Sequence, residues 1–349
     1  MIKIATMTIN TQVLKLIAEL DEFKGRWEML SKLSPDKLQS LRRVATIESV
    51  GSSTRIEGAK LSDQEVDLLL MNLDIRSFRS RDEEEVAGYA DAMETVFASW
   101  ELIPFTENHI KQLHGMLLRY STKDQGHCGE YKKLSNKVEA FDADCKSIGI
   151  VFETASPFDT PRLMADLVSS TAQELANRVL HPIMVIAAFI VHFLAIHPFQ
   201  DGNGRLSRVL TSLLLLKSGY RYVPYSSLER IIEESKDSYY RALRMSQKQI
   251  RTSEENLDDW VSFFLQCLKK QKDVLLRKVE QEKILERLSA VSEQLLIQAK
   301  ERGRLTITEA VKLLGINRNT VKLHLRQLVQ QGYLEQHGAG KATWYSLGK

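Results

Sequence analysis

The sequence predicts a mainly α-helical protein with one small β-hairpin and a separate C-terminal module. Proline and glycine are scarce, at 7 and 17 of 349 residues, and apolar residues recur at helical spacing along most of the chain. The segment 121–159 differs because it is polar and because Ile148, Ile150 and Phe152 alternate with other residues, which is typical of a strand or hairpin. Residues 300–349 are more basic than the rest of the chain, which indicates a distinct module.

The composition is that of an ordinary globular protein with room for more than one domain, because 43% of the residues are hydrophobic and 27% are charged. The cysteines at 128, 145 and 267 are odd in number and irregularly spaced, so we expect reduced thiols and not a disulfide framework. The N-terminus lacks the core and cleavage site of a signal peptide, and the apolar segment 183–196 is too short for a membrane span. We therefore expect a cytoplasmic protein with no membrane partner.

Helices are expected in the following order. Residues 12–33 are amphipathic, and a second helix begins at Ser34-Pro35-Asp36 and runs toward Glu57, where Gly58 ends it. A capping signal at 61–65 begins a short third helix through Leu73. The remaining helices of the main body are expected at 82–101, 106–120, 161–178, 183–196, 204–218, 236–249 and about 257–276. The charged stretch 273–283 is an expected exposed helical connector.

The run 197–208 reads His-Pro-Phe-Gln-Asp-Gly-Asn-Gly-Arg-Leu-Ser-Arg. Pro198 disfavours helix at the residue before it, so the preceding apolar helix should end at His197. A second helix follows from about Gly204. The turn 202–204 therefore lies at a helix N-terminus, where free N–H groups and the helix dipole suit phosphate oxygens.

The side chains of this run match phosphate chemistry. Arg205 and Arg208 are three residues apart, so they can share one helical face, and guanidinium groups suit forked contacts to phosphates. Asp201 is the hard oxygen ligand that phosphate-bound magnesium prefers. His197 is the residue of the run that can take a proton near neutral pH. A calcium loop is the alternative for Asp-Gly-Asn-Gly, but Ser212 stands where that loop needs a glutamate.

The run resembles the signature of the Fic family, His-Pro-Phe-x-Asp/Glu-Gly-Asn-Gly-Arg-x-x-Arg, at every fixed position. The resemblance covers roughly residues 40–270. It implies a helical core with a β-hairpin flap that transfers AMP from ATP to a Ser, Thr or Tyr hydroxyl of a target protein or of the chain itself. The implied site consists of the base His197, the magnesium ligand Asp201, the phosphate cradle Gly202, Asn203 and Gly204, and the cations Arg205 for the pyrophosphate and Arg208 for the γ-phosphate.

A second segment resembles the inhibitory motif of many Fic proteins, Ser/Thr-x-x-x-Glu-Gly/Asn. Ser53, Glu57 and Gly58 occupy its fixed positions within an inhibitory helix expected at about 43–58. Ser53 and Glu57 are four residues apart and hence on one helical face. Because the last turn of a helix repels anions, Glu57 requires a compensating cation, and the resemblance implies that this cation is Arg208.

Two further segments are assigned by the resemblance. The helix that begins Lys236-Asp-Ser-Tyr-Tyr is similar to one beside the nucleotide base, so Tyr240 is assigned to nucleotide binding. Core packing is the alternative for either tyrosine of the pair. The stretch Ser147–Thr154 corresponds to the flap, whose exposed edge aligns the target by strand addition, although it has fewer prolines than the family pattern. An ordinary edge strand is the alternative there.

Residues 280–349 resemble a winged helix-turn-helix. Thr308–Leu314 and Arg318–Gln330 are expected helices on either side of a Gly-containing turn, and two strands after them form the wing. Residues 300–349 hold nine lysines and arginines but three glutamates. Such modules bind DNA or dock other proteins. Val321, Leu325, Leu328 and Val329 form the buried stripe of the second helix, and the outward residues that can contact DNA are Arg318, Asn319, Lys322 and Arg326.

The expected organisation has three parts: an N-terminal helical region at 1–110 that includes the inhibitory helix, a catalytic core at 111–275 and the winged module at 280–349. ATP is the expected co-substrate and Mg²⁺ the expected metal. The expected partners are a target protein, DNA and a second copy of the chain. Three rival hypotheses stay open: removal of AMP with Glu57 activating a water, transfer of another nucleotide or phosphate-containing group, and a DNA-binding regulator whose body senses ATP.

Overall fold

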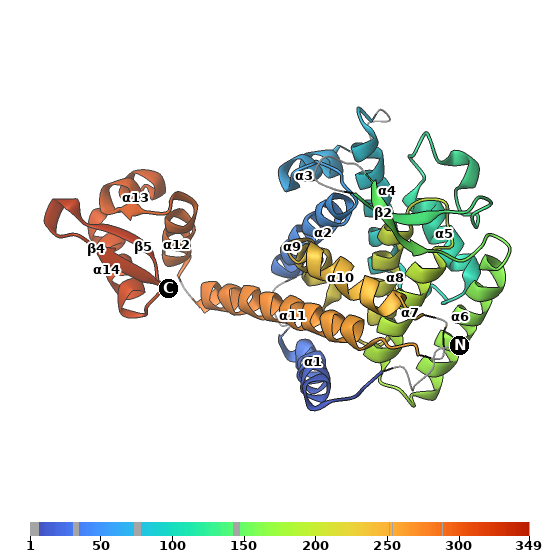
Figure 1. Ribbon diagram of the computed structural model, residues 1–349. Helices are drawn as coiled ribbons and strands as arrows, with labels where there is room; N and C mark the ends of the chain where they lie inside the picture. The colour runs from blue at the N-terminus through green and yellow to red at the C-terminus, as the bar shows by residue number, and fades with distance from the viewer. Residues whose placement is uncertain are drawn as a thin grey trace. The chain divides into compact units, whose positions relative to one another are not determined.

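The computed structural model describes residues 7–30, 35–72, 78–141, 147–250, 252, 254–287 and 289–348 (Figure 1). The chain forms two compact units, Met1–Leu275 and Leu276–Lys349. The boundary between them falls within helix α11 (Asp258–Arg287). The mainly helical fold expected from the sequence is confirmed.

The first unit is built from helices and, within the part of the chain that the structure describes, one β-hairpin. Its remaining helices are α1 (Thr11–Leu30), α2 (Pro35–Ile56), α3 (Asp63–Met71), α4 (Arg81–Ser99), α5 (Glu107–Leu117), α6 (Thr160–Asn177), α7 (Pro182–Ile196), α8 (Asn203–Lys217), α9 (Leu228–Glu234) and α10 (Lys236–Gln247), with short 3₁₀ turns at Gln125–His127 and Val223–Tyr225.

Helix α7 forms the centre of this unit. All its residues except Pro182 and His192 are buried, and α6, α8 and α10 pack against it. The indole N–H of Trp260 on α11 donates to the carbonyl of Ala187 at 2.7 Å, which fixes α11 to α7. The apolar helix expected at 183–196 is confirmed. Because α7 ends just before the run 197–208 and α8 begins within it, at Asn203, this core holds both ends of the run in place.

Helices α4 and α5 approach each other closely at Gly88. The backbone of Leu117 fills the space that a side chain on Gly88 would need. This approach matters for the site because Glu85, one turn earlier on α4, contacts Arg205 of α8, and His114, one turn earlier on α5, contacts the loop between α7 and α8.

We therefore expect Gly88→Ala to lower the free energy of unfolding by about 1–3 kcal/mol, because the opposing group is backbone and cannot turn away. Gly115→Ala on α5 is the matched control, since a methyl group there would meet no atom within 4 Å. It should raise stability by ~0.5–1 kcal/mol through helix propensity. Urea unfolding of the two variants measures the difference, and equal midpoints would contradict the assigned packing.

The hairpin consists of β1 (Lys137–Phe141) and β2 (Ser147–Glu153), paired antiparallel from Lys137 opposite Glu153 to Phe141 opposite Ser147. The register shifts at two points along it. The predicted strand at 147–154 is confirmed. The connection at 142–146 lies outside the described residues.

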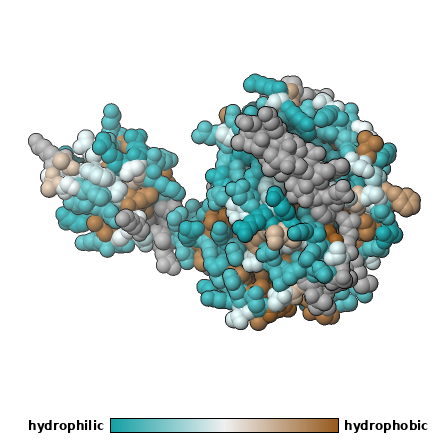
Figure 2. All heavy atoms as spheres, viewed as in Figure 1, coloured by the Kyte–Doolittle hydropathy of each residue, from teal (hydrophilic) through white to brown (hydrophobic). Residues whose placement is uncertain are grey.

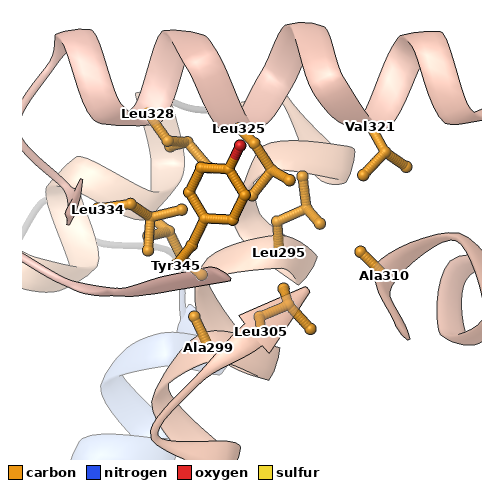
Figure 3. Packing of buried hydrophobic residues seen from close by; sticks show 10 residues of the cluster. Leu295, Ala299, Leu305, Ala310, Val321, Leu325, Leu328, Leu334 and Tyr345 are labelled. Atoms are coloured by element: carbon orange, nitrogen blue, oxygen red, sulfur yellow. The ribbon is translucent and has the colours of Figure 1, made fainter. Parts of the chain in front are cut away.

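The second unit contains α12 (Ala290–Arg302), α13 (Ile307–Leu314) and α14 (Arg318–Gln330) beside a sheet of order β3-β5-β4. The strands are β3 (Leu305–Thr306), β4 (Leu334–His337) and β5 (Trp344–Leu347), with a 3₁₀ turn at Gly340–Ala342. Figure 3 shows Leu325 and Leu328 of α14 packed against Tyr345 of β5 and Leu295 of α12.

The expectations differ from the structure in several elements. Helices α9 and α12 were not predicted, and α11 continues without a break through the expected helical connector at 273–283 to Arg287. The wing has a third strand, β3, which at two residues is too short to show alternation in sequence. Helix α9 has seven residues, fewer than two full turns, so its periodicity is equally weak.

Hydrophilic side chains cover most of the face that Figure 2 shows, with hydrophobic ones scattered among them. Among the described residues, no helix combines the length and the apolar character that a bilayer crossing requires.

Candidate active site

The run 197–208 forms the loop between α7 and α8, at 197–202, and the first turns of α8. His197 ends α7 in the left-handed conformation, with φ 53°, and its N–H donates to the carbonyl of Phe193 at 2.8 Å. Gly202 precedes α8 with φ 76°, a conformation that glycine adopts without strain. The predicted helix end at His197 and the helix start predicted at about Gly204 agree with the observed end of α7 at Ile196 and start of α8 at Asn203. The first N–H groups of α8 therefore point out of the helix beside His197.

His197 is held as a neutral base. Its Nδ1 lies 3.2 Å from the carbonyl of Leu194, which can only accept, so Nδ1 carries the proton and Nε2 is the acceptor. Burial lowers the pKa of His197 to about 4. At neutral pH the imidazole is therefore uncharged, with Nε2 able to take a proton.

Asn203 closes the loop with its side chain. The amide accepts from the N–H of Phe199 at 2.9 Å and donates to the carbonyl of Phe199 at 2.8 Å. The side chain is buried, so it stabilises the turn and is not directed at a ligand. Because the side-chain amide is occupied in this way, Asn203 can contribute to the predicted phosphate cradle through its backbone N–H at the start of α8.

His114 supports the same loop from α5, although no sequence motif marked it. Its ring stacks on Phe199 with centroids 3.8 Å apart. The N–H of Gly129 donates to Nδ1 at 3.0 Å, so Nε2 carries the proton and donates to the carbonyl of Asp201 at 3.0 Å. Burial lowers the pKa of His114 to about 4, and this neutral form is the one the two hydrogen bonds require.

A buried lysine joins the loop to the base of the hairpin. The ammonium of Lys132 donates to Asn136 Oδ1 at 2.8 Å, to Thr154 Oγ1 at 2.9 Å and to the carbonyl of Ile196 at 3.0 Å. Asn136 in turn donates to the carbonyl of Phe199 at 2.8 Å. These bonds fix the two ends of the hairpin, at 136 and 154, beside the residue that precedes His197.

Asp201 belongs to a closed ring of four charges. Its Oδ2 accepts from Arg205 Nη2 at 3.3 Å and from Arg81 Nη2 at 3.0 Å. Glu85 lies on the opposite side of the ring, with Oε1 2.8 Å from Arg81 Nε and Oε2 3.1 Å from Arg205 Nη1. The second contact is an ion pair without hydrogen-bond alignment, and Arg205 Nε likewise has no hydrogen-bond partner among the described residues.

The burial of Asp201 tends to raise the pKa of its carboxyl group. Arg205, the N–H of Gly202 and Arg81 outweigh this effect and lower the pKa. Asp201 is therefore ionised at neutral pH, as a metal ligand must be. Arg81 and Glu85 were not predicted, because a charged helix face such as 81–85 is usually solvated and carries no motif.

Arg208 joins the predicted inhibitory helix. Its Nε donates to Ser53 Oγ at 2.8 Å, and its Nη2 donates to the carbonyl of Ser53 at 3.0 Å and to Glu57 Oε1 at 2.7 Å. The Arg208 side chain is 4% exposed and the Glu57 side chain 34% exposed. The pairing that the sequence resemblance implied is present in this structure.

The Glu57 carboxylate also lies on the N-terminus of α8. A Cβ atom on Gly204 would collide with this carboxylate, so glycine is required there for the two to meet. Glu57 is thus placed beside the unpaired N–H groups and the positive end of the helix dipole. An internal anion occupies the position that the sequence assigned to phosphate oxygens.

Arg55 holds the end of α2 from its other side. Its guanidinium pairs with Glu233 of α9 at 2.6 Å and with Asp63 of α3 at 2.9 Å, and it donates to the carbonyl of Leu61 at 2.9 Å. Arg230 also contacts Asp63, at 3.2 Å. These contacts fix the turn that carries Ser53 and Glu57.

The two tyrosines of α10 differ in environment. Tyr239 is buried with its ring 5.9 Å from that of Trp260, so it packs in the core. Tyr240 is exposed, and its hydroxyl is 3.4 Å from the carbonyl of Ile56, next to Glu57. Tyr240 therefore lies at the rim of the site with a ring surface open to a ligand.

In the second unit, the buried stripe of α14 is formed by Val321, Leu325 and Leu328, as expected, while Val329 is partly buried. The four polar residues predicted to face outward are all exposed. Asn317 begins the helix by accepting from the N–H of Asn319 at 2.9 Å. The four predicted residues are Arg318, Asn319, Lys322 and Arg326, and Leu323, Gln327 and Gln330 of α14 are exposed as well.

Within the described part of the chain, no group of three or more His, Cys, Asp or Glu side chains is arranged to hold a metal ion by itself. Cys128 and Cys267 are not in disulfide bonds, and Cys145 lies outside the described residues. A cavity of about 780 Å³ lies apart from the site, lined by residues that include Lys24, Arg178 and Lys217. The residues predicted for the active site do not line that cavity.

Comparison with known proteins now identifies the class. Residues 104–215 match the Fic/DOC family, and residues 297–338 match the IclR helix-turn-helix domain. The chain thus contains a Fic/DOC family region and a C-terminal IclR-type helix-turn-helix. The matched Fic segment contains the whole loop and most of α8.

Among curated proteins, the chain is similar to the protein adenylyltransferase Fic of Drosophila grimshawi, with 26% identity over 241 residues that make up 68% of this chain and 44% of that protein. The corresponding Drosophila melanogaster protein is 26% identical over 261 residues, which are 74% of this chain and 48% of that one. The chain thus spans about half the length of the curated relatives it matches.

Two solved structures have the same fold. A Fic domain-containing signaling protein from Bacteroides thetaiotaomicron is 26% identical with a TM-score of 0.61, over 76% of this chain and 97% of that one. A Fic family protein from Desulfovibrio desulfuricans is 25% identical with a TM-score of 0.61, over 97% of both chains.

Proposed function

We propose that the protein transfers AMP from ATP to a Ser, Thr or Tyr hydroxyl of a target protein, and that Glu57 inhibits this reaction. The observation that carries the proposal is the Glu57 carboxylate, which pairs with Arg208 at 2.7 Å and lies on the N-terminus of α8. An anion held by a buried guanidinium and a helix N-terminus marks a phosphate position. The names of the Drosophila relatives support the same reaction.

In this mechanism the target hydroxyl gives its proton to Nε2 of His197. The oxygen then forms a bond to the α-phosphorus of ATP while the bond from that phosphorus to the pyrophosphate oxygen breaks. The first N–H groups of α8 stabilise the charge on the phosphate oxygens, which is electrostatic preorganisation. Arg205 and Arg208, both buried, hold the pyrophosphate end.

The residues present fit a magnesium ion. Magnesium in nucleotide sites is bound by one or two carboxylates together with substrate phosphates and water, and Asp201 supplies one ionised carboxylate that is 38% exposed. When bound there, the ion would neutralise charge on the phosphates.

The exposed Tyr240 ring fits the adenine position. The paired strand β2 fits strand addition by the segment that carries the hydroxyl. A cytoplasmic setting, with ATP available and thiols reduced, fits the reaction and the unpaired Cys128 and Cys267.

The experiment that tests the proposal is the intact mass of the Glu57→Gly protein and of lysate proteins after incubation with ATP and magnesium. A mass increase equal to one AMP group on either would support transfer. A mass increase matching a different nucleotide, when that nucleotide is supplied, would favour the rival transferase. Release of AMP from previously modified protein by the wild type, but not by Glu57→Gly, would favour the removal reaction, with Glu57 activating the water.

A second function is favoured by the C-terminal module. The IclR-type match and the exposed basic face of α14 support DNA binding by that unit. The combination would make the chain a regulator whose catalytic unit responds to ATP.

We expect Arg318→Ala combined with Lys322→Ala to weaken binding to duplex DNA and to reduce the slope of log affinity against log salt by about 2, because each cation that neutralises a phosphate contributes about 0.9. AMP transfer should be unchanged. Fluorescence anisotropy with mixed-sequence duplex at several salt concentrations measures this. Wild-type protein that binds no duplex even at low salt would indicate protein docking.

A further inference from the structure

We infer that Arg81 is a phosphate-binding residue of this site, which exchanges its contact with Asp201 for an oxygen of the pyrophosphate end of ATP when magnesium binds. This role rests on the proposed function and adds a residue outside the run 197–208. It starts from the four-charge ring of Asp201, Arg205, Glu85 and Arg81.

Within the ring, two arginines balance the negative charge of the Asp201 carboxylate. One carboxylate oxygen, Oδ2, accepts from two guanidinium groups, 3.0 Å from Arg81 and 3.3 Å from Arg205. A magnesium ion needs the same carboxylate, and a dication on a carboxylate repels guanidinium groups at that distance. Because of this repulsion, binding of magnesium-bound ATP favours the departure of one of the two arginines from Asp201.

The two arginines differ in their freedom to leave. The Arg205 side chain is 3% exposed and extends from α8 itself, four residues after Asp201. The Arg81 side chain is 47% exposed and comes from the first turn of α4. Moving a buried guanidinium away from its carboxylate is costly, because neither water nor another acceptor replaces the lost contact. An exposed guanidinium can turn into solvent or onto a ligand. Arg81 is therefore the arginine that moves.

Glu85 determines where Arg81 goes. Its Oε1 holds Arg81 Nε at 2.8 Å, and this contact within α4 does not involve Asp201. With Nε still held, the two Nη groups stay within a few ångströms of the Asp201 carboxylate and of any phosphate that shares a metal with it. A guanidinium fork matches two phosphate oxygens, which makes a polyphosphate the fitting ligand. Glu85 is thus a positioning residue for both arginines.

The test is calorimetric binding to the full chain carrying Glu57→Gly, with and without Arg81→Gln. The substitution should weaken binding of ATP with magnesium by ~10-fold or more, the usual effect of losing a charge-assisted hydrogen bond. AMP, which lacks the pyrophosphate, should bind both proteins within about twofold. With EDTA in place of magnesium, ATP affinity should also differ by no more than about threefold, because Arg81 then stays on Asp201.

Arg79→Gln is the matched control, since it removes a guanidinium two residues away that lies outside the ring. It should leave all three affinities unchanged. Arg81→Lys should recover only part of the ATP affinity, because an ammonium cannot span Glu85 and a phosphate as the fork does.

Equal affinity of the two proteins for ATP with magnesium would overturn the role of Arg81 and leave the proposed function standing. An equal loss for ATP and AMP, or a loss that persists in EDTA, would also overturn it, because each would show a general effect of charge or structure. If the Glu57→Gly protein with Arg81 intact binds no ATP at all, the proposed function fails as well.

Discussion

Replacement of His197 by alanine is expected to slow AMP transfer by ~10²–10⁴-fold while ATP still binds, the usual effect of removing a general base. The structure gives the reason. His197 Nδ1 is directed at the carbonyl of Leu194, so Nε2 is the atom that can accept the proton of the target hydroxyl. The contacts assigned to the nucleotide come from other residues, in the loop before α8 and on α8, α4 and α10. Transfer from α-labelled ATP gives the rate, and calorimetry gives ATP affinity.

His109→Ala, which removes a histidine of α5 outside the site, is the control and should transfer at the parent rate. A His197→Ala protein that folds, binds ATP and transfers AMP as fast as its parent would show that the base is another group. The pH dependence provides a second check. Since burial lowers the pKa of His197 to about 4, the base is already neutral at physiological pH. The rate should stay level from about pH 8 to 6 and fall only as the pH approaches that pKa.

The second large effect is expected from Glu57→Gly, which should raise AMP transfer on the order of 10²-fold, the scale that a misplaced reacting group costs. In the wild type, Glu57 occupies both the Arg208 contact and the N-terminus of α8. ATP then has to bind without these two anion contacts, and its α-phosphate is not presented to the hydroxyl. Initial rates with saturating ATP measure the effect.

Two variants separate the charge of Glu57 from its size. Glu57→Gln keeps the side chain but removes the charge, so it should be activated less than Glu57→Gly and more than wild type. Ser53→Ala removes one hydrogen bond to Arg208 and leaves the 2.7 Å ion pair, so its activation should be small. A folded, ATP-binding Glu57→Gly protein that is no faster than wild type would rule out inhibition by Glu57.

Much of the site could be predicted from the sequence because it is contiguous. The run 197–208 carries its own helix end, turn and helix start, set by Pro198 and Gly202, so local rules were enough to place its side chains. The pairing of Glu57 with Arg208 joins residues 151 positions apart. This pairing was predicted from the family resemblance, and from the argument that the negative charge of Glu57 at a helix C-terminus needs a nearby cation.

The supporting residues could not be predicted in this way. His114, Lys132 and Glu85 are single polar residues on helices or loops, and nothing near them in sequence distinguishes them from surface residues. Each acquires its role through the backbone or side chain of a distant segment. Asn203 is a related case, because the sequence predicted a place for its backbone in the phosphate cradle but not the two hydrogen bonds by which its side chain holds the turn.

The left-handed backbone of His197 sets stability against activity in this fold. A residue other than glycine costs roughly 1–2 kcal/mol in that conformation, and helices that end in this way usually have glycine or asparagine there. Glycine at 197 would relieve the backbone and would remove the imidazole that serves as the base in the proposed reaction. Under that proposal, selection for thermal stability alone would favour an inactive protein.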